Sequence, residues 1–139
     1  MIKRKASIVW EGGIRHGQGA ITTESGAEAR YSANRNHSAK VANPDELIAA
    51  AHATCFSMAL ANELAQGGFT ALRIHTTATV TIEELAAGWT TTGIELDVEA
   101  QVHGAKQIDF IQAALSAKTN CPTSRLLNTV ISMNARLIA

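Results

Sequence analysis

Two stretches of the chain alternate between apolar and polar residues, and both predict β-strands. Every second residue from Leu72 to Ile82, and again from Ile94 to Val102, is apolar, with Thr76 the one exception, whereas polar residues fill most of the opposite phase. A period of two with one polar face is typical of an antiparallel pair that packs on one side only. The turn between the two strands is expected at Ala86–Gly88.

The segment from Asn43 to Gly68 lacks this alternation and predicts one long helix. Asn43 is a favourable N-cap, and Pro44 suits the first helical position because an N–H there would have no partner. Gly67 and Gly68 supply the stop. The residues between, Leu47–Leu64, are rich in alanine and apolar almost all round, which is typical of a buried helix. One small domain cannot easily cover such a helix, so we expect an intertwined homodimer.

Shorter patterns complete a β-β-β-α-β-β-α-α-β order of elements. We expect strands at Ile2–Trp10, Ala20–Ser25, Glu28–Asn36 and Thr129–Ile138, a loop at Arg35–Ala42, and helices at Gln107–Lys118 and Pro122–Leu127. The first of these helices is expected to turn Ile108, Ile111 and Leu115 inward. This order predicts an α+β fold with antiparallel sheets around a long buried central helix. The length of 139 residues fits a single domain, residues 1–139.

Composition changes this picture mainly by excluding partners. Twelve basic and twelve acidic residues give a formal net charge of zero, so no general electrostatic field attracts nucleic acid or anionic lipid. No apolar run approaches the ~18 residues of a membrane span. Ala6–Trp10, which follows the basic Lys3–Lys5, is too short for the apolar region of a signal peptide. We therefore expect a cytoplasmic protein without nucleic-acid or membrane partners.

The two cysteines, Cys55 and Cys121, are the candidate reactive groups. In a cytoplasmic chain, two cysteines favour reactive, metal-binding or simply buried thiols over a structural disulfide. Cys55 lies in the apolar helix, where burial raises a thiol pKa, so a reactive Cys55 needs a nearby cation from Arg35 or Arg15. Cys121 precedes Pro122 and is expected at the N-cap of a short helix, whose free N–H groups can stabilise a thiolate. The alternative is an inert thiol, as a small core residue at Cys55 or as a plain capping residue at Cys121.

His52 lies three residues before Cys55, on the same helix face. It could activate Cys55 as in cysteine hydrolases, share a metal with it, or be a hydrogen-bonded core histidine, which is the commonest case. The other four histidines have no ligand spacing, so no metal is expected. The N-terminal glycines lack the strand–loop–helix context of a nucleotide site and indicate turns.

Longer segments resemble a known family. Residues 43–60, NPDELIAAAHATCFSMAL, look like the central helix of the osmotically inducible protein C (OsmC) family. Asn120–Ser124 resembles the second cysteine motif of that family, and Trp10–Gly13 and Thr23–Gly26 resemble its N-terminal hairpin. The sister group is the organic hydroperoxide resistance (Ohr) proteins, and the HATCFSM run favours the OsmC branch.

The resemblance implies a peroxidase that works as an obligate homodimer. Cys55 takes the place of the cysteine that attacks an organic hydroperoxide, and Cys121 that of the cysteine that resolves the product as a disulfide. Arg35 matches an arginine that stabilises the thiolate, and a carboxylate after the Asn-Pro pair orients it. That carboxylate is Asp45 here, where Glu is usual, and Glu46, about 100° further round the helix, is the alternative. An external thiol, such as a lipoyl group, restores the dithiol without a metal or organic cofactor, and hydrogen peroxide is a weaker substrate.

Two other classes of function stay open. A Cys55–His52 hydrolase or acyl-thioester enzyme would not need Cys121 and would form no disulfide with peroxide. A non-enzymatic dimer that binds an apolar ligand would have inert thiols, and alkylating agents would label Cys55 slowly.

Overall fold

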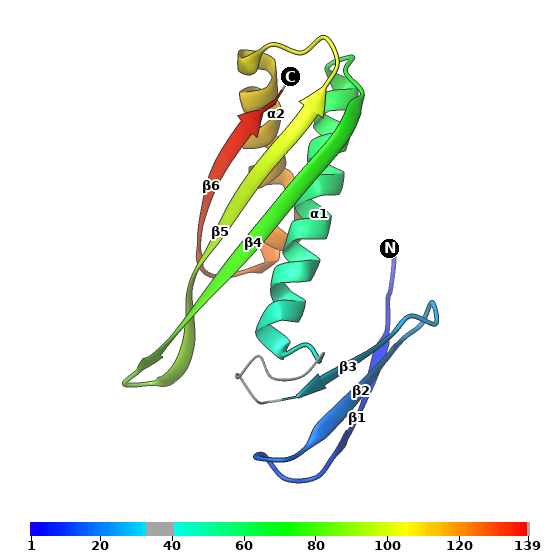
Figure 1. Cartoon of the computed structure of the whole chain (residues 1–139), viewed down its shortest axis with the longest axis vertical. Helices are drawn as coiled ribbons and strands as arrows, with labels where there is room; N and C mark the ends of the chain where they lie inside the picture. Colours follow the sequence, from blue (N-terminus) through cyan, green and yellow to red (C-terminus); the bar gives the residue numbers. More distant parts are fainter. Residues whose placement is uncertain (33–40, 139) are drawn as a thin grey trace. The chain divides into compact units, whose positions relative to one another are not determined.

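The computed structural model describes residues 1–32 and 41–138, and its elements follow the predicted order (Figure 1). Spatial contacts divide the chain into two compact units, Met1–Leu47 and Ile48–Ala139. We expect a single domain for residues 1–139, and with the chain divided in this way that expectation stays a prediction.

The N-terminal unit contains a three-stranded antiparallel sheet in the order β1-β2-β3. Its strands are β1 (Ala6–Glu11), β2 (Gln18–Thr23) and β3 (Glu28–Ser32). The predicted strands are present, although the first begins four residues after Ile2 and the second begins two residues before Ala20. The predicted end of the third strand, residues 33–36, lies outside the described residues, as does most of the loop predicted at residues 35–42.

Helix α1 (Pro44–Gln66) has the limits that its capping residues predict. The Asn43 side-chain oxygen accepts a hydrogen bond from the Glu46 backbone N–H at 2.9 Å, and the Asn43 amide donates to the Glu46 carboxylate at 3.3 Å. At the other end, Gly68 adopts a left-handed backbone with φ +86°, and its N–H donates to the Ala65 carbonyl at 3.0 Å. These contacts satisfy backbone groups that a helix end otherwise leaves without partners.

Only one stripe of α1 is buried within a single chain. Its buried side chains recur every four residues, at His52, Phe56, Leu60 and Leu64. Met58 is 70% exposed and Ile48 is 36% exposed. One chain therefore does not bury this helix on all sides, and the apolar surface that stays open is the part a partner would have to cover.

By length and composition alone, α1 could cross a membrane, since it has 23 residues and a mean hydropathy of 1.2 over 18 of them. The expectation that no segment approaches a membrane span is wrong in this respect. The core helix of a globular protein passes the same test, so the property is weak support for a membrane segment.

The second unit is built on a sheet in the order β4-β5-β6. Its strands are β4 (Ala71–Leu85), β5 (Gly88–Val102) and β6 (Val130–Leu137). β4 and β5 form the predicted antiparallel hairpin, and the residues of β5 predicted to face inward are buried. Leu72 is predicted inward but is 70% exposed, because a bulge between Ala71 and Arg73 shifts the phase there. β6 runs parallel to β5, so this sheet is mixed rather than antiparallel throughout.

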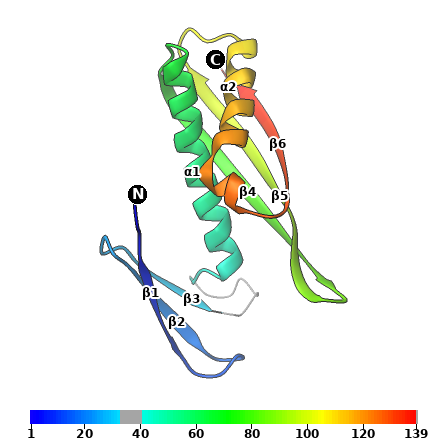
Figure 2. The ribbon, with the colours of Figure 1, turned by 180° about the vertical axis from the view of Figure 1, so that it is seen from behind.

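Helices α2 (Gln107–Asn120) and α3 (Pro122–Leu126) connect β5 to β6. Figures 1 and 2 both place α1 and α2 on the same face of the sheet. The buried side chains of α2 are Phe110, Ala114 and Ala117. Of the three residues predicted to face inward, Ile111 packs against the core, whereas the prediction is wrong for Ile108 and Leu115, which are 60% and 54% exposed. The prediction favoured large aliphatic residues, but small alanines let a helix approach its neighbours closely and so decide which face is buried.

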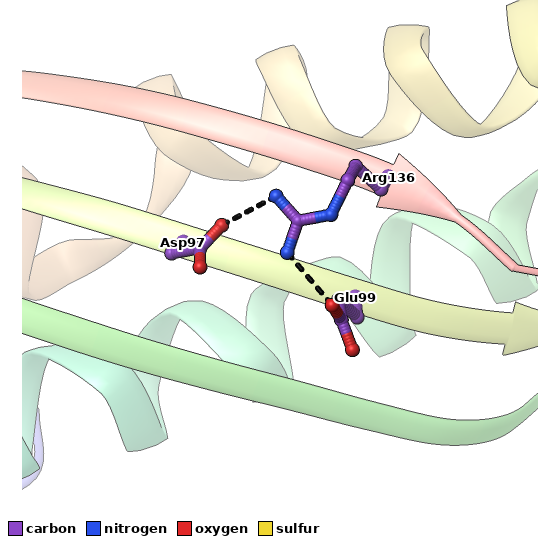
Figure 3. A network of polar contacts seen from close by, with 3 residues as sticks. All are labelled: Asp97, Glu99 and Arg136. Carbon is purple, nitrogen blue, oxygen red and sulfur yellow. Dashed lines mark hydrogen bonds and ion pairs between the residues drawn. The ribbon is translucent and has the colours of Figure 1, made fainter.

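The opposite face of the sheet is polar, as the alternation predicts. Arg136 of β6 lies between Asp97 and Glu99 of β5, at 2.7 and 2.8 Å from their carboxylate oxygens (Figure 3). The hydrogen bond and the charge of Arg136 lower the pKa of Asp97, and the two carboxylates raise the pKa of Arg136. All three side chains are about 40% exposed, so water screens these ion pairs.

Candidate active site

Cys55 lies near the middle of α1 and is partly buried, whereas Cys121 is fully buried. Cys121 forms the junction of two helices. Its N–H donates to the Ala117 carbonyl at 2.8 Å, and its carbonyl accepts the Arg125 N–H at 3.1 Å. Pro122 begins α3 and separates it from α2, because proline has no N–H to continue the helical hydrogen bonds. The predicted N-cap position of Cys121 is therefore confirmed.

Three donors surround the Cys55 sulfur. The hydroxyl and the backbone N–H of Thr123 donate hydrogen bonds to it, and so does the Cys121 thiol. Burial raises the pKa of the Cys55 thiol, but these hydrogen bonds outweigh burial and leave the pKa below its ordinary value. All three donors are neutral, so part of the thiolate stabilisation that the sequence assigns to an arginine comes instead from the start of α3.

Thr123 is the residue that sequence reasoning missed. It follows Pro122 and therefore carries one of the first N–H groups of α3, which have no acceptor inside the helix. The sequence does contain a signal for this N–H, because Thr123 lies two residues after the predicted N-cap Cys121. The threonine hydroxyl, by contrast, carries no signal in the sequence that it would point to a thiol on a different helix.

The two cysteines are neighbours in the structure although they lie 66 residues apart in the sequence. α1 supplies one and the α2–α3 junction supplies the other, and both are free thiols. Two thiols in hydrogen-bond contact can join as a disulfide once one of them is oxidised. The arrangement is therefore suited to reversible thiol chemistry.

His52 is fully buried and contacts Ser124 of α3, with 2.7 Å between its Nε2 and the serine oxygen. Burial lowers the pKa of His52, which favours the neutral imidazole. Its other ring nitrogen, Nδ1, has no hydrogen-bond partner among the described residues. The hydrogen bonds on the Cys55 sulfur come from Thr123 and Cys121, so the geometry does not support a Cys55–His52 hydrolase. Within the described chain, no three His, Cys, Asp or Glu residues gather as metal ligands.

The remaining candidate residues belong to the first 47 residues. Arg35 lies outside the described residues. Arg15 lies in the exposed turn between β1 and β2. Asp45, partly buried, and Glu46, exposed, are both in the first turn of α1, where Glu46 accepts the hydrogen bond from the Asn43 amide. Asp45 precedes Cys55 by ten residues, about 15 Å along the helix, so it can influence the thiol only through another side chain.

The chain is similar to known proteins in both sequence and fold. A model of the family "OsmC-like protein" matches residues 37–136. The peroxiredoxin OsmC of Escherichia coli strain K12 is 41% identical, over 98% of this chain and 97% of the relative. An OsmC-like protein of unknown function from Vibrio cholerae superposes with a TM-score of 0.84 at 14% identity, covering 98% of this chain and 100% of its own. The organic hydroperoxide resistance protein OhrB of Bacillus subtilis gives 0.69 at 18% identity, covering 96% and 98%.

Proposed function

This chain belongs to the OsmC-like protein family, and we propose that it is a thiol-dependent peroxidase that reduces organic hydroperoxides. The observation that carries the proposal is the contact between two free thiols, in which Cys121 donates a hydrogen bond to a Cys55 whose pKa is lowered. The relative at 41% identity is named a peroxiredoxin, and a solved structure of the same fold is named an organic hydroperoxide resistance protein. Both names support the same class of reaction.

The proposed cycle starts from the Cys55 thiolate. It attacks the O–O bond of the hydroperoxide, so that an S–O bond forms, the O–O bond breaks, and the alkoxide leaves and takes up a proton to become an alcohol. The Cys121 thiol then attacks the sulfur of the Cys55 sulfenic acid, forming the disulfide and releasing water. An external dithiol, for which a lipoylated protein is our candidate, reduces the disulfide. Hydrogen peroxide is a weaker substrate, and the cycle uses no metal or organic cofactor.

In this proposal, Arg35 stabilises the Cys55 thiolate and Asp45 orients Arg35. The part-buried position of Asp45 supports this choice, as does the hydrogen bond that Glu46 already accepts from Asn43. A charge held in place stabilises a thiolate more effectively than a mobile one. Arg15 is the alternative for the active-site arginine, and Glu46 is the alternative for the carboxylate that orients it.

The protein acts as an intertwined homodimer in the cytoplasm. The open face of α1, which includes Met58, supports the dimer because a second chain would cover it. Light scattering across a dilution series tests this part. The dimer is expected to persist until the chain unfolds, and a folded monomer would contradict it.

A thiol count before and after one equivalent of cumene hydroperoxide tests the activity. We expect both thiols to disappear and non-reducing mass spectrometry to find an intrachain Cys55–Cys121 disulfide, with one equivalent of alcohol released. Two free thiols after treatment would contradict the peroxidase, and slow alkylation of Cys55 would then favour the non-enzymatic dimer.

Four variants test the charged residues, with stopped-flow rates of Cys55 oxidation as the measurement. Arg35→Ala and Asp45→Ala should slow the reaction at temperatures where both are folded, whereas Asp45→Glu should keep or raise the rate. Arg15→Ala is the matched control. An essential Arg15 beside a dispensable Arg35 would reverse the assignment.

A further inference from the structure

The peroxidase cycle leaves one buried polar contact near the thiols without a role. His52 and Ser124 lie 72 residues apart in the sequence, yet their side chains meet at 2.7 Å. His52 precedes Cys55 by three residues, and Ser124 follows Cys121 by three. The hydrogen bond therefore joins α1 to α3 about one helical turn away from each cysteine.

Besides this contact, α3 is held by the hydrogen bonds from Thr123 to Cys55 and by the buried Cys121 at its N-cap. The helix has only five residues, and none of them is buried. Leu126, its largest apolar side chain, is 78% exposed. Pro122 interrupts the hydrogen bonds that would otherwise continue from α2. A short helix without a buried side chain gains little from packing, so a buried hydrogen bond has a large share in setting its position.

The protonation of His52 is consistent with a donor to Ser124. Nδ1 is buried without a partner in the described structure, and Nε2 contacts the serine hydroxyl. Burying a ring nitrogen that carries no proton costs less free energy than burying an N–H without an acceptor. We therefore assign the proton to Nε2. His52 then donates to Ser124, whose own hydroxyl proton stays available to a further acceptor.

We propose that His52 and Ser124 are positioning residues, which hold the turn from Cys121 to Ser124 against Cys55 and so govern the step in which Cys121 attacks oxidised Cys55. In that step the S–S bond forms and the group on the Cys55 sulfur leaves, as water in the peroxidase cycle. The step needs the Cys121 sulfur in line with the Cys55 sulfur and its leaving group, whereas attack on the hydroperoxide does not involve the Cys121 sulfur as a reactant. Loss of the pair therefore slows resolution more than it slows oxidation.

The proposal rests on the proposed peroxidase for its biological meaning, but the thiol chemistry can be tested without peroxide. An aromatic disulfide such as Ellman's reagent forms a mixed disulfide at the partly exposed Cys55 and releases one thionitrobenzoate. Cys121 then attacks the Cys55 sulfur and releases the second. The two absorbance phases report access to Cys55 and resolution by Cys121 separately, on the full-length protein.

We expect Ser124→Ala and His52→Leu to slow the second phase about tenfold and to slow the first phase less, by the extent to which the Thr123 donors in the same turn move away from Cys55. His52→Gln, whose amide can donate from a position close to Nε2, should restore most of the rate. Glu63→Ala is the matched control, because it removes the exposed contact between Glu63 and Asn120 at the end of α2 and should change neither phase. Melting curves show whether each variant folds. If the variants of the buried His52 do not fold, Ser124→Ala alone decides.

An unchanged second phase in folded Ser124→Ala would overturn the proposal, and so would a His52→Gln rate as slow as that of His52→Leu. With cumene hydroperoxide, the same variants should accumulate more Cys55 sulfinic acid, since a second peroxide competes with the slowed Cys121. The wild-type chain could fail to react with hydroperoxides and still show both phases with the aromatic disulfide. That result would contradict the proposed peroxidase function and leave the proposal for His52 and Ser124 intact.

Discussion

The second unit holds polar contacts of similar length in different surroundings, one between strands on the open side of its sheet and one between the helices on the other side. On the open face, Arg136 meets Asp97 and Glu99 at 2.7 and 2.8 Å, and water reaches all three side chains. On the face that the helices cover, His52 meets Ser124 at 2.7 Å, and the histidine is fully buried. Solvent screens the ion pairs of Arg136. Water does not reach the buried His52, so it cannot take the place of the hydrogen bond to Ser124. Distance alone therefore says little about what a polar contact contributes, and burial decides.

The largest expected effect lies on the covered face, at the cysteines themselves. Cys55→Ser should abolish hydroperoxide reduction, because a serine hydroxyl is not ionised near neutral pH and does not form a sulfenic acid. Cys121→Ser should still consume one equivalent of hydroperoxide and then stop, since no thiol resolves the product. Alcohol released per chain, measured in single-turnover and multiple-turnover assays, checks both. Full turnover by Cys121→Ser would mean that the reaction does not need the buried thiol of Cys121.

Thr123 should show a smaller but clear effect on the same face. Thr123→Val keeps the shape of the side chain and removes the hydroxyl donor, so the pKa of Cys55 should rise. Alkylation of Cys55 near neutral pH should slow about tenfold, as expected for one hydrogen bond to a charged group. Thr123→Ser keeps the hydroxyl and serves as the control. Equal pH profiles for the two variants would assign the stabilisation to the backbone N–H.

A pH series sharpens the comparison through His52. Burial lowers its pKa in the folded chain, whereas the unfolded chain titrates near 6.5. Between the folded pKa and about 6.5 the unfolded chain binds more protons, so this contribution to stability is complete above pH ~6.5 and is lost as pH falls through the window. Urea unfolding at several pH values checks this. His52→Gln should flatten the dependence, and an unchanged slope would assign it to other groups.

The smallest effect is expected on the open face. Arg136→Ala removes both ion pairs, yet its side chain and both partners are well exposed, so the melting temperature should fall only slightly. The rates of Cys55 oxidation and disulfide formation should match those of the wild type. Added salt should narrow the small stability difference. A large drop in melting temperature, or a slower thiol reaction, would mean that the two faces are not as different as their exposure indicates.

Local signals in the sequence account for most elements and for the cysteine candidates. Asn43 and the glycine pair fix the limits of α1 because capping depends on neighbours along the chain, and alternation fixes the buried residues of β5 for a similar reason. The direction of β6 carries no local signal. It depends on how α2 and α3 cross the sheet, so an antiparallel arrangement is a reasonable prediction that the structure corrects.

The site shows the same limit. The pairing of Cys55 with Cys121 comes from a family resemblance rather than from spacing, since 66 residues separate them. Thr123 and Ser124 lie inside the recognised motif, but what their side chains contact depends on the packing of α3 against α1. Contacts across a fold are set by tertiary structure, and a single sequence records them only weakly.

The parallel pairing of β5 with β6 has a consequence for the order of folding. β4 and β5 close over a two-residue turn, whereas β6 can join only after the crossover of residues 103–129 has folded over the sheet. Contacts that close long loops form late, because their entropy cost comes before their gain. Cys121 and Thr123 are part of this crossover, so the donors to Cys55 arrive with the last strand. A chain still emerging from the ribosome therefore carries Cys55 without its partner thiol, and the reactive centre is among the last parts of the protein to assemble.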